Sequence, residues 1–256
     1  MNDKFIFKRG YMKITAFNGT HKTGESNTAI LVDHFLQGAA EEGAQIEHVR
    51  LAQTRIQPCT ACKACWQKTP GKCVIADDMS GLLKKFISSD IVVLASPIYA
   101  DNISGLLKTF IDRLIPVGDP HWEFDEHGES RHCRRHAKPT RLVAVSNCGY
   151  PEQSHFDVLR LYFRRLCRNM HLELSGEIYR GAGALLAGGI PEFAGYLDSY
   201  LDLVKNAGRE VVRQGRVSEG LAESLEAPMV PLPGFNQIFL AKVNQLIDAH
   251  ITPKTS

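Results

Sequence analysis

The amino-acid sequence predicts an α/β fold, a five-stranded parallel sheet in the order 2-1-3-4-5 with helices on both faces and a C-terminal helical extension. The first observation is that strand-like and helix-like segments alternate five times between residues 12 and 215. The second is DIVVLASPIY (90–99), an apolar run typical of a parallel strand buried on both faces. Such alternation builds a parallel sheet, and five strands favour this order.

The first strand–helix–strand unit is predicted from local patterns. MKITAFNG (12–19) has alternating strand-forming residues and ends in Asn-Gly. In the helix expected at 26–43, apolar residues recur at every fourth position, and Gly43 suits the helix end. A second strand is expected at 44–52.

The later elements follow the same rhythm, with one interruption. A capping aspartate opens the helix expected at 77–89, and apolar residues align along a helix at 104–115. We expect the polar segment 118–140 to be an insertion loop. The remaining strands and helices alternate at 141–149, 154–170, 171–183 and 196–215.

These boundaries define the expected organisation of the chain. A sheet domain covers 12–215 and contains a cysteine loop at 58–73 and the insertion loop at 118–140. A helical extension covers 216–256.

Composition narrows the class of protein. With 44% hydrophobic residues and a formal net charge of +2, the chain suits a globular domain with no nucleic-acid surface. It has no run of eighteen apolar residues, so no membrane span is expected. The apolar patch near the start is too short for a signal peptide, and seven cysteines cannot all pair with one another. We therefore expect a cytoplasmic protein with reduced thiols.

Three loops should converge, because strands 1, 3 and 4 are neighbours in this sheet and ligands bind beyond their carboxyl ends. NGTHKTGESNTA (18–29) is rich in hydroxyls, carries Lys22 and enters a helix N-terminus, which suits a phosphate. The loop after strand 3 offers Tyr99 to a flat ring, and the loop after strand 4 offers Gly149 and Tyr150. Taken singly, a capped helix explains the first loop as well as a phosphate site does, and local packing explains Tyr99 better than a ring contact. Together they describe a mononucleotide site with a large ring, which FMN fits.

Four segments, MKITAFNGTHKTGESNTA, PCTACKACWQKTPGKCVIADDM, SPIYADNISGLLKTFIDRL and SNCGYPEQSHF, resemble the flavodoxin-like NAD(P)H-dependent FMN reductase superfamily, nearest the iron–sulfur flavoproteins. The resemblance covers most of 12–215. It implies an FMN-dependent enzyme, NADPH or NADH as donor, and a homo-oligomer, either a dimer or a tetramer.

The resemblance also implies a set of FMN contacts. The residues that would hold the phosphate are Thr20, Lys22, Ser26, Asn27 and Thr28. Those that would line one side of the ring are Ser96, Pro97, Ile98, Tyr99 and Asn102, and those at its other edge are Asn147, Gly149 and Tyr150. Relatives commonly have Ser-Pro-Arg where this chain has Thr20-His21-Lys22, so the charge remains but the bidentate grip of arginine is lost.

Four of the seven cysteines lie in one loop with the spacing C-x2-C-x2-C-x7-C, namely Cys59, Cys62, Cys65 and Cys73. An iron–sulfur cluster takes one thiolate per iron, and two-residue spacings let a tight loop supply three. Zinc usually binds two separated C-x2-C pairs, and reduced thiols without a metal are the third interpretation. The resemblance implies a [4Fe–4S] cluster. Because the loop follows strand 2, we expect it on the same rim of the sheet as the flavin.

The leading hypothesis is an FMN-dependent oxidoreductase that passes electrons from a nicotinamide through an iron–sulfur relay to a quinone, an aromatic compound, oxygen or a protein. Hydride transfer to flavin requires no protein acid or base, so no catalytic residue is named. One alternative is a non-enzymatic FMN/iron–sulfur carrier with a ferredoxin-like partner. Another is a zinc-stabilised binding module with a degenerate flavin pocket. The basic segment 131–138 is interpreted as a solvated loop, or else as a site for the 2′-phosphate of NADPH or an acidic partner.

We predict that the flavin is FMN and not FAD. The loop after strand 1 can hold one terminal phosphate, and the chain has no G-x-G-x-x-G sequence for a pyrophosphate. Flavin released by denaturation and separated by chromatography should be FMN. Recovery of FAD alone would contradict the prediction.

Overall fold

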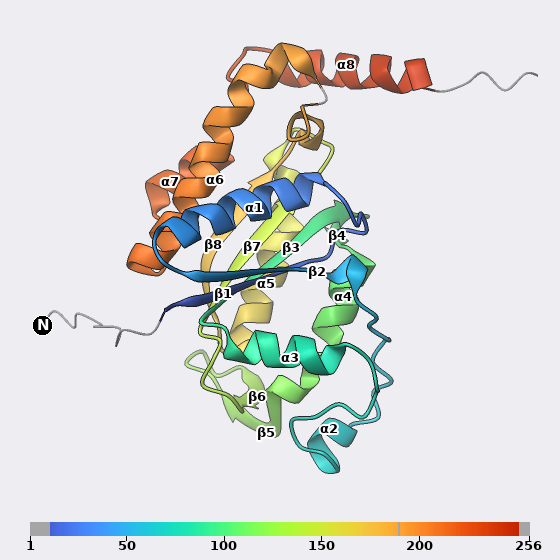
Figure 1. Ribbon diagram of the computed structural model, residues 1–256, viewed down its shortest axis with the longest axis vertical. Helices are drawn as coiled ribbons and strands as arrows, with labels where there is room; N and C mark the ends of the chain where they lie inside the picture. Colours follow the sequence, from blue (N-terminus) through green and yellow to red (C-terminus); the bar gives the residue numbers. More distant parts are fainter. Residues whose placement is uncertain (1–10, 189, 251–256) are drawn as a thin grey trace, which may run out of the picture.

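Five parallel strands form the centre of the molecule in the computed structural model, which describes residues 11–188 and 190–250 (Figure 1). The strands are β1 (Lys13–Asn18), β2 (Gln45–Arg50), β3 (Ile91–Tyr99), β7 (Arg141–Asn147) and β8 (Glu173–Arg180). Their order is β2-β1-β3-β7-β8, so the predicted fold class and strand order 2-1-3-4-5 are confirmed. A two-residue strand, β4 (Asn102–Ile103), pairs antiparallel with the end of β3.

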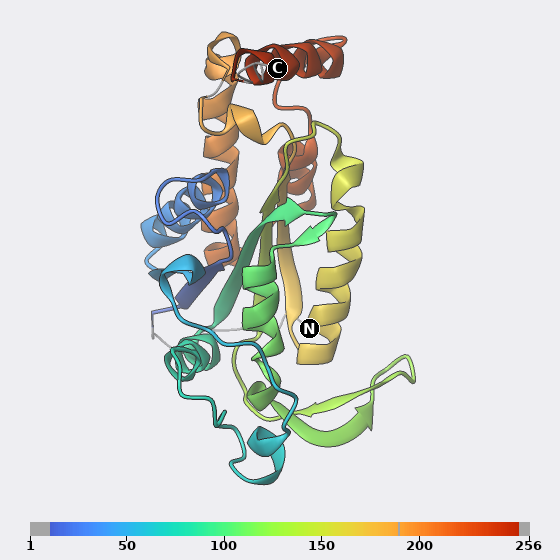
Figure 2. The ribbon, with the colours of Figure 1, turned by 90° about the vertical axis from the view of Figure 1, so that its right-hand side faces the viewer.

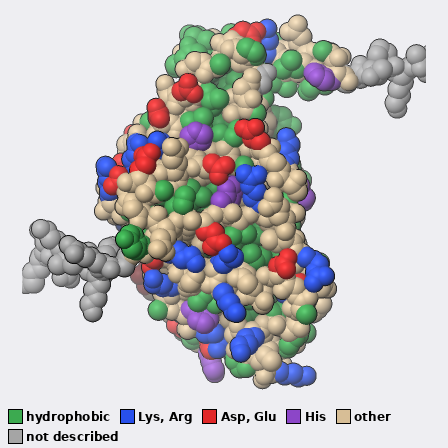
Figure 3. Space-filling view, viewed as in Figure 1, with side chains coloured by type: hydrophobic (Ala, Val, Ile, Leu, Met, Phe, Trp, Pro, Cys, Tyr) green, Lys and Arg blue, Asp and Glu red, His purple; other side chains and the backbone are tan. Residues whose placement is uncertain are grey.

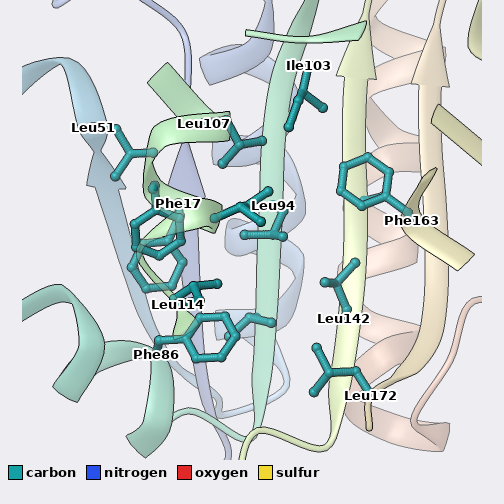
Figure 4. Close-up of a cluster of buried hydrophobic side chains, with 14 of the residues drawn as sticks. Phe17, Leu51, Phe86, Leu94, Ile103, Leu107, Leu114, Leu142, Phe163 and Leu172 are labelled. Carbon is teal, nitrogen blue, oxygen red and sulfur yellow. The ribbon is translucent and has the colours of Figure 1, made fainter. Parts of the chain in front are cut away.

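Successive side chains of the buried strands point to opposite faces of the sheet, so each face has its own hydrophobic core. In β3, Val92 and Leu94 join one hydrophobic cluster, whereas Ile91, Val93 and Ala95 join the other. The first cluster packs against α3 (Met79–Ser88), α4 (Gly105–Asp112) and α5 (Asp157–Met170). Figure 4 shows its centre, where Phe17 lies near Leu94 and Phe86 near Leu114.

The second cluster lies under α1 (Asn27–Glu41) and α6 (Ala194–Gln214). Figure 2 shows these two helices together on one side of the sheet, with α5 on the other. They approach so closely at two glycines that a Cβ at Gly38 would run into the carbonyl oxygen of Lys205, and a Cβ at Gly208 into that of Phe35.

The segment expected to be an insertion loop contains a hairpin instead. β5 (Gly118–Phe124) pairs antiparallel with β6 (Ser130–Arg134). The turn is organised by Asp125, whose Oδ1 accepts hydrogen bonds from the backbone N–H groups of His127 and Glu129. Both faces of these strands carry many polar side chains, so the sequence lacks the alternation that reveals a strand with one buried face.

The C-terminal part is helical, as expected. α7 (Glu219–Glu226) packs against β8 and α6, and α8 (Phe235–His250) extends from the top of the molecule in Figure 1. Only Phe235 and Phe239 of α8 are buried. Apolar residues exposed along it are Ile238, Leu240, Leu246 and Ile247, and Figure 3 shows hydrophobic side chains at this end. Residues 251–256 of the expected extension lie outside the described residues.

Short helical turns complete the described chain. They are η1 (Leu51–Gln53), α2 (Ala64–Gln67), η2 (Ile115–Val117), η3 (Gln153–Phe156), η4 (Gly183–Leu185) and η5 (Pro191–Phe193). Within 11–188 and 190–250, none of the helices combines the length and apolar character that a bilayer span requires.

We predict that Gly208→Ala lowers the free energy of unfolding by about 1–3 kcal/mol, because the added methyl group must displace the backbone of α1. Gly195→Ala is a matched control on the same helix, since a Cβ there meets no atom within 4 Å. It should be neutral or stabilising by up to about 1 kcal/mol. Urea denaturation measures both variants, and equal effects would argue against the tight α1–α6 contact.

Candidate functional site

The loops after β1, β3 and β7 meet at one edge of the sheet, and hydrogen bonds join them. The Nδ2 of Asn147, the last residue of β7, donates to the Oγ1 of Thr28 at the start of α1 at 2.7 Å. The Oγ of Ser104, at the start of α4, donates to the carbonyl oxygen of Gly19 at 2.6 Å. We call this edge the flavin rim, after the cofactor predicted for it.

The loop between β1 and α1 leaves polar groups available for an anion. Ser26 caps α1, and its Oγ accepts from the backbone N–H of Ala29 at 3.1 Å. The backbone N–H groups of Asn27 and Thr28 have no acceptor among the described residues. These N–H groups, together with the helix dipole, fit a phosphate. Lys22 is exposed in the same loop.

Two residues outside the predicted set hold this loop in place. The Oδ1 of the buried Asn18 accepts from the backbone N–H of Thr20 at 3.0 Å. The Nη1 of Arg50 donates to the carbonyl oxygens of Thr23 and Gly24, at 3.2 and 2.9 Å. Asn18 directly precedes the glycine of the predicted loop, so sequence reasoning had a signal for it. Arg50 comes from the neighbouring strand, and no pattern in the sequence indicated that it would contact this loop.

The turn between β3 and β4 is strained. Ala100 and Asp101 have φ of 48° and 56°, in the left-handed region that residues other than glycine avoid. Such strain is concentrated at binding and active sites. The turn exposes Tyr99 and brings its ring centroid to 5.9 Å from that of His21 in the first loop. The side chain of Asn102 accepts from its neighbour Ile103 at 2.8 Å.

Ser96, Pro97 and Ile98 lie in the last part of β3, where it reaches the rim. The hydroxyl of Ser96 accepts from the backbone N–H of Ser104 at 2.8 Å, and its carbonyl oxygen accepts from Ser146 at 2.7 Å. Ser96 therefore connects the N-cap of α4 with the end of β7. Ser104 and Ser146 were not predicted from the sequence.

The loop after β7 leaves open space beside its glycine. A Cβ at Gly149 would meet no atom within 4 Å. Tyr150 is exposed and stacks on His155, with ring centroids 4.6 Å apart. A Cβ at Gly183 would press on the carbonyl oxygen of Cys148, so Gly183, which was not predicted, allows the end of β8 to close on this loop. Burial raises the pKa of Cys148 to about 11, as expected for a thiol that packs in the structure and does not react.

The four cysteines of the loop line one cavity of about 130 Å³, together with apolar side chains such as Val74 and Pro116. Ala61 and Lys63 have φ of 53° and 55°, which lets the chain turn sharply between the thiols. Burial raises the pKa of Cys65, whereas a hydrogen bond from the backbone N–H of Ala64 lowers that of the exposed Cys62.

The donor set of this cavity fits a cluster better than a single ion. In the part of the chain that the structure describes, no three His, Cys, Asp or Glu side chains are grouped so that they could hold one metal ion. Zinc requires its sulfurs to converge at about 2.3 Å from one point. A cubane cluster takes one thiolate per iron, so its four sulfurs surround a larger volume. The four thiols that line this cavity match the number of ligands that such a cluster takes.

The expectation that the cysteine loop lies on the flavin rim is wrong. The loop leaves β2 at that rim, but Arg55 and Gln57 donate through their backbone N–H groups to Asp78 and Asp77 before α3 and carry the chain away. α4 runs from the flavin rim to the cysteine cavity, because Ser104 caps it at the rim and Asp112, at its other end, lines the cavity. At about 1.5 Å per residue, its eight residues separate them by about 12 Å. Figure 1 shows α2, in the cysteine loop, far from β4.

A buried ion pair fixes the cysteine loop. The side chains of Arg113 and Asp77 are 1% and 0% exposed, and the Nη1 of Arg113 donates to the Oδ2 of Asp77 at 2.7 Å. The same guanidinium donates to the carbonyl oxygen of Gln57 at 2.6 Å and to the Sγ of Cys73 at 3.4 Å. Burial opposes ionisation of Asp77, but hydrogen bonds from Arg113 and from two backbone N–H groups outweigh it and hold the pKa below its usual range. In the sequence, Arg113 directly follows the apolar residues of α4. This position indicates a buried charge, which the sequence analysis did not predict.

The chain matches the model of the family described as NADPH-dependent FMN reductase over residues 12–147. An iron–sulfur flavoprotein of Methanocaldococcus jannaschii is 39% identical over 106 residues, which cover 41% of this chain and 53% of that protein. An iron–sulfur flavoprotein of Archaeoglobus fulgidus is 39% identical over 127 residues, which cover 50% and 52%. The chain spans about half the length of the curated relatives it matches.

Solved structures share the fold. An FMN-dependent NADH-azoreductase from Bacillus anthracis, in complex with FMN, superposes with a TM-score of 0.59 at 19% identity, covering 78% of this chain and 99% of that one. The NAD(P)H:quinone oxidoreductase of Methanothermobacter marburgensis gives 0.55 at 11% identity, covering 79% and 98%.

We predict that Asp77→Asn lowers the free energy of unfolding at pH 7 by about 3–5 kcal/mol, because it leaves the buried Arg113 unpaired. The pKa of Asp77 is lowered in the folded state, so the pair stabilises the fold above the ordinary carboxyl pKa of about 4 and is lost as the pH falls through the folded-state value. The difference from the parent protein should therefore shrink in acid. Asp78→Asn is the matched control, since Asp78 is exposed, has no buried cation as partner, and the asparagine keeps an oxygen for the backbone N–H of Arg55. It should change stability little. Denaturant titrations from pH 7 to pH 3 measure this, and a pH-independent difference would contradict it.

Proposed function

Since this chain belongs to the NADPH-dependent FMN reductase family, we propose that it is an FMN-dependent oxidoreductase that takes electrons from NADPH or NADH. The observation that carries this proposal is the hydrogen bond from Asn147 to Thr28. It joins the end of β7 to the N-terminus of α1, so the proposed phosphate-binding helix start and the proposed ring-binding loops lie on one rim. Bound FMN would supply the hydride and electron chemistry, and the protein would bind and orient it.

The proposed phosphate site uses Thr20, Lys22, Ser26, Asn27 and Thr28. Asn27 and Thr28 contribute backbone N–H groups, Ser26 acts as the helix cap that aims them, and Lys22 adds a charge from the exposed side. Arg50 holds the loop from behind through two carbonyl oxygens.

The proposed ring site lies between two loops. Ser96, Pro97, Ile98, Tyr99 and Asn102 line one side, and Asn147, Gly149 and Tyr150 the other. The exposed ring of Tyr99 and the open space at Gly149 support this assignment, because a flat heterocycle needs an aromatic surface and close approach to backbone. The stacking of Tyr150 on His155 supports a role as a fixed wall.

We further propose that Cys59, Cys62, Cys65 and Cys73 hold a [4Fe–4S] cluster. The support is the set of four thiols around one apolar cavity and the printed names of the relatives, which are iron–sulfur flavoproteins. Arg113 donates to the Sγ of Cys73, so it would position that thiolate and offset its charge.

The distance of about 12 Å along α4 bears on how the cluster and the flavin would work together. We propose a homo-oligomer, a dimer or a tetramer, in which the cysteine loop of one subunit approaches the flavin rim of another. The exposed apolar side chains of α8 support an interface there. The electron acceptor would then be a small molecule or a protein that reaches the cluster.

We predict that anaerobic addition of NADPH or NADH to the FMN-loaded protein bleaches the flavin absorption within seconds. The reason is that hydride transfer from a nicotinamide is the activity proposed for the rim. Stopped-flow absorbance near 450 nm measures it, with free FMN and NADPH as the control. Persistent flavin colour with both nicotinamides would favour the alternative, a non-enzymatic FMN/iron–sulfur carrier with a ferredoxin-like partner.

We predict that Cys62→Ala abolishes the broad iron–sulfur absorption and leaves FMN bound, because the cysteine cavity and the flavin rim lie at opposite ends of α4. After anaerobic reconstitution the parent chain should hold roughly four iron atoms. Cys133→Ser, outside the loop in β6, is the matched control and should keep the iron. No more than trace iron in the parent protein would refute the cluster and leave the flavin proposal standing.

A further inference from the structure

Behind the flavin rim, a chain of side-chain contacts connects α1 to the loop after β1. The Oδ1 of Asp33, on α1, lies 2.7 Å from the Nδ1 of His48, on β2. The Nε2 of His48 lies 3.2 Å from the Nδ2 of Asn18, the last residue of β1. The Oδ1 of Asn18 in turn accepts from the backbone N–H of Thr20 at 3.0 Å. We call Asp33, His48 and Asn18 the loop support.

These contacts decide where the proton of the His48 imidazole lies. A backbone N–H can only donate, so the atom of Asn18 that faces Thr20 must be the carbonyl oxygen. The amide nitrogen of Asn18 then faces the Nε2 of His48, and because an amide nitrogen donates, Nε2 must accept. The neutral imidazole therefore carries its proton on Nδ1 and donates it to Asp33.

Asp33 holds this tautomer as a carboxylate. Burial opposes its ionisation, but the hydrogen bond from His48 and the charge of Arg50 hold the pKa of Asp33 below its usual range. A carboxylate only accepts, so it requires a proton on the Nδ1 of His48. Asp33 thus selects the tautomer that Asn18 needs, and that tautomer selects the orientation of the Asn18 amide that Thr20 needs.

Burial leaves the Asn18 amide no substitute partners. Asn18 is fully buried, and among the described residues only His48 and Thr20 contact its side-chain amide. If the Nε2 acceptor is removed, the amide nitrogen stays buried without a partner, or the amide flips and turns its nitrogen toward the N–H of Thr20. Either outcome costs a buried hydrogen bond and loosens the turn at Thr20.

Thr20 is the residue through which the loop support reaches a ligand. It is only 4% exposed, and its hydroxyl has no hydrogen-bond partner among the described residues. That hydroxyl oxygen is nevertheless not among the buried atoms closed off from solvent. It is therefore held in place and still open to a phosphate oxygen at the N-terminus of α1.

Asp33 also contacts the residue that holds the other end of this loop. Its Oδ2 lies 3.9 Å from the Nη2 of Arg50, whose Nη1 donates to the carbonyl oxygens of Thr23 and Gly24. One carboxylate thus lies behind both ends of the loop.

We propose that Asp33 and His48 are positioning residues of the phosphate site. They fix the orientation of the Asn18 amide, and through it the place of the Thr20 hydroxyl beside the N-terminus of α1. This inference rests on the phosphate site proposed above and adds two residues that act on it from behind. Since they act on the phosphate loop alone, they should govern affinity for FMN and leave affinity for riboflavin, which lacks the phosphate, unchanged.

Flavin binding by the full chain, freed of its flavin, tests the proposal. Quenching of flavin fluorescence gives the dissociation constants of FMN and riboflavin. In His48→Gln, the side-chain oxygen can occupy the place of Nε2 and accept from Asn18. In His48→Asn, the shorter side chain reaches only the place of Nδ1. We expect His48→Asn to weaken FMN binding about two- to tenfold, the range for one lost hydrogen bond, and His48→Gln to stay within about twofold of the parent. Riboflavin affinity should be the same in all three proteins.

The tautomer itself is measured without any flavin. In ¹⁵N-histidine NMR spectra at pH 8, the parent should show an imidazole with a protonated Nδ1 and a bare Nε2, assigned to His48 by its loss in His48→Gln. Free histidine favours the opposite tautomer, so this signature does not arise by default. Asp33→Ala should convert His48 toward that opposite tautomer and weaken FMN binding at least as much as His48→Asn does.

Three results would overturn the proposal, namely a His48 protonated on Nε2, unchanged FMN affinity in His48→Asn, or equal losses for FMN and riboflavin. Thermal melting checks that each variant is folded. Asp33 is half exposed, so Asp33→Ala decides the matter if His48→Asn does not fold. A parent protein that binds neither flavin would refute the flavin site as a whole, whereas FMN binding that is insensitive to these variants would refute only the loop support.

Discussion

The buried ion pair between Arg113 and Asp77 is the constraint on which the cysteine end of this molecule depends. One guanidinium at the end of α4 contacts the start of α3 through Asp77, the descending chain through Gln57, and the thiol of Cys73. A buried pair adds little net stability over a well-packed apolar contact, but losing one partner leaves an uncompensated buried charge. The pair therefore specifies one position for the cysteine loop.

The same helix that carries Arg113 also sets the distance between the two proposed redox sites. Ser104 anchors the start of α4 to the loop after β1, and its end is held by Asp77. α4 thus acts as a spacer with both ends fixed by buried polar contacts. A second cavity lies beside the far end of this spacer, next to the cysteine cavity.

The order of the sheet and the convergence of three loops could be predicted because they depend on the local sequence pattern of each strand and of the loop that follows it. The run at β3 and the hydroxyl-rich loop after β1 are local signals, and the topology of a parallel sheet converts them into a shared rim. The course of the cysteine loop could not be predicted, since it depends on backbone hydrogen bonds to Asp77 and Asp78, about twenty residues further on. The hairpin at β5 and β6 was missed because its strands lack a clear buried face. Ser104 and Ser146 were missed because a single buried polar residue resembles any other in the sequence until its partner is known.

The left-handed backbone conformations of Ala61 and Lys63 bear on how readily proteases in a cell would degrade the chain. Each holds a conformation that a residue other than glycine adopts only when its surroundings enforce it. In a chain whose four thiols are not tied together, these two residues favour opening of the loop, while the sheet core keeps its own packing. Local opening exposes backbone to proteases, so chains without the proposed cluster would be cut at this loop first. The cysteine loop would then act as a checkpoint by which unloaded chains are removed and loaded ones persist.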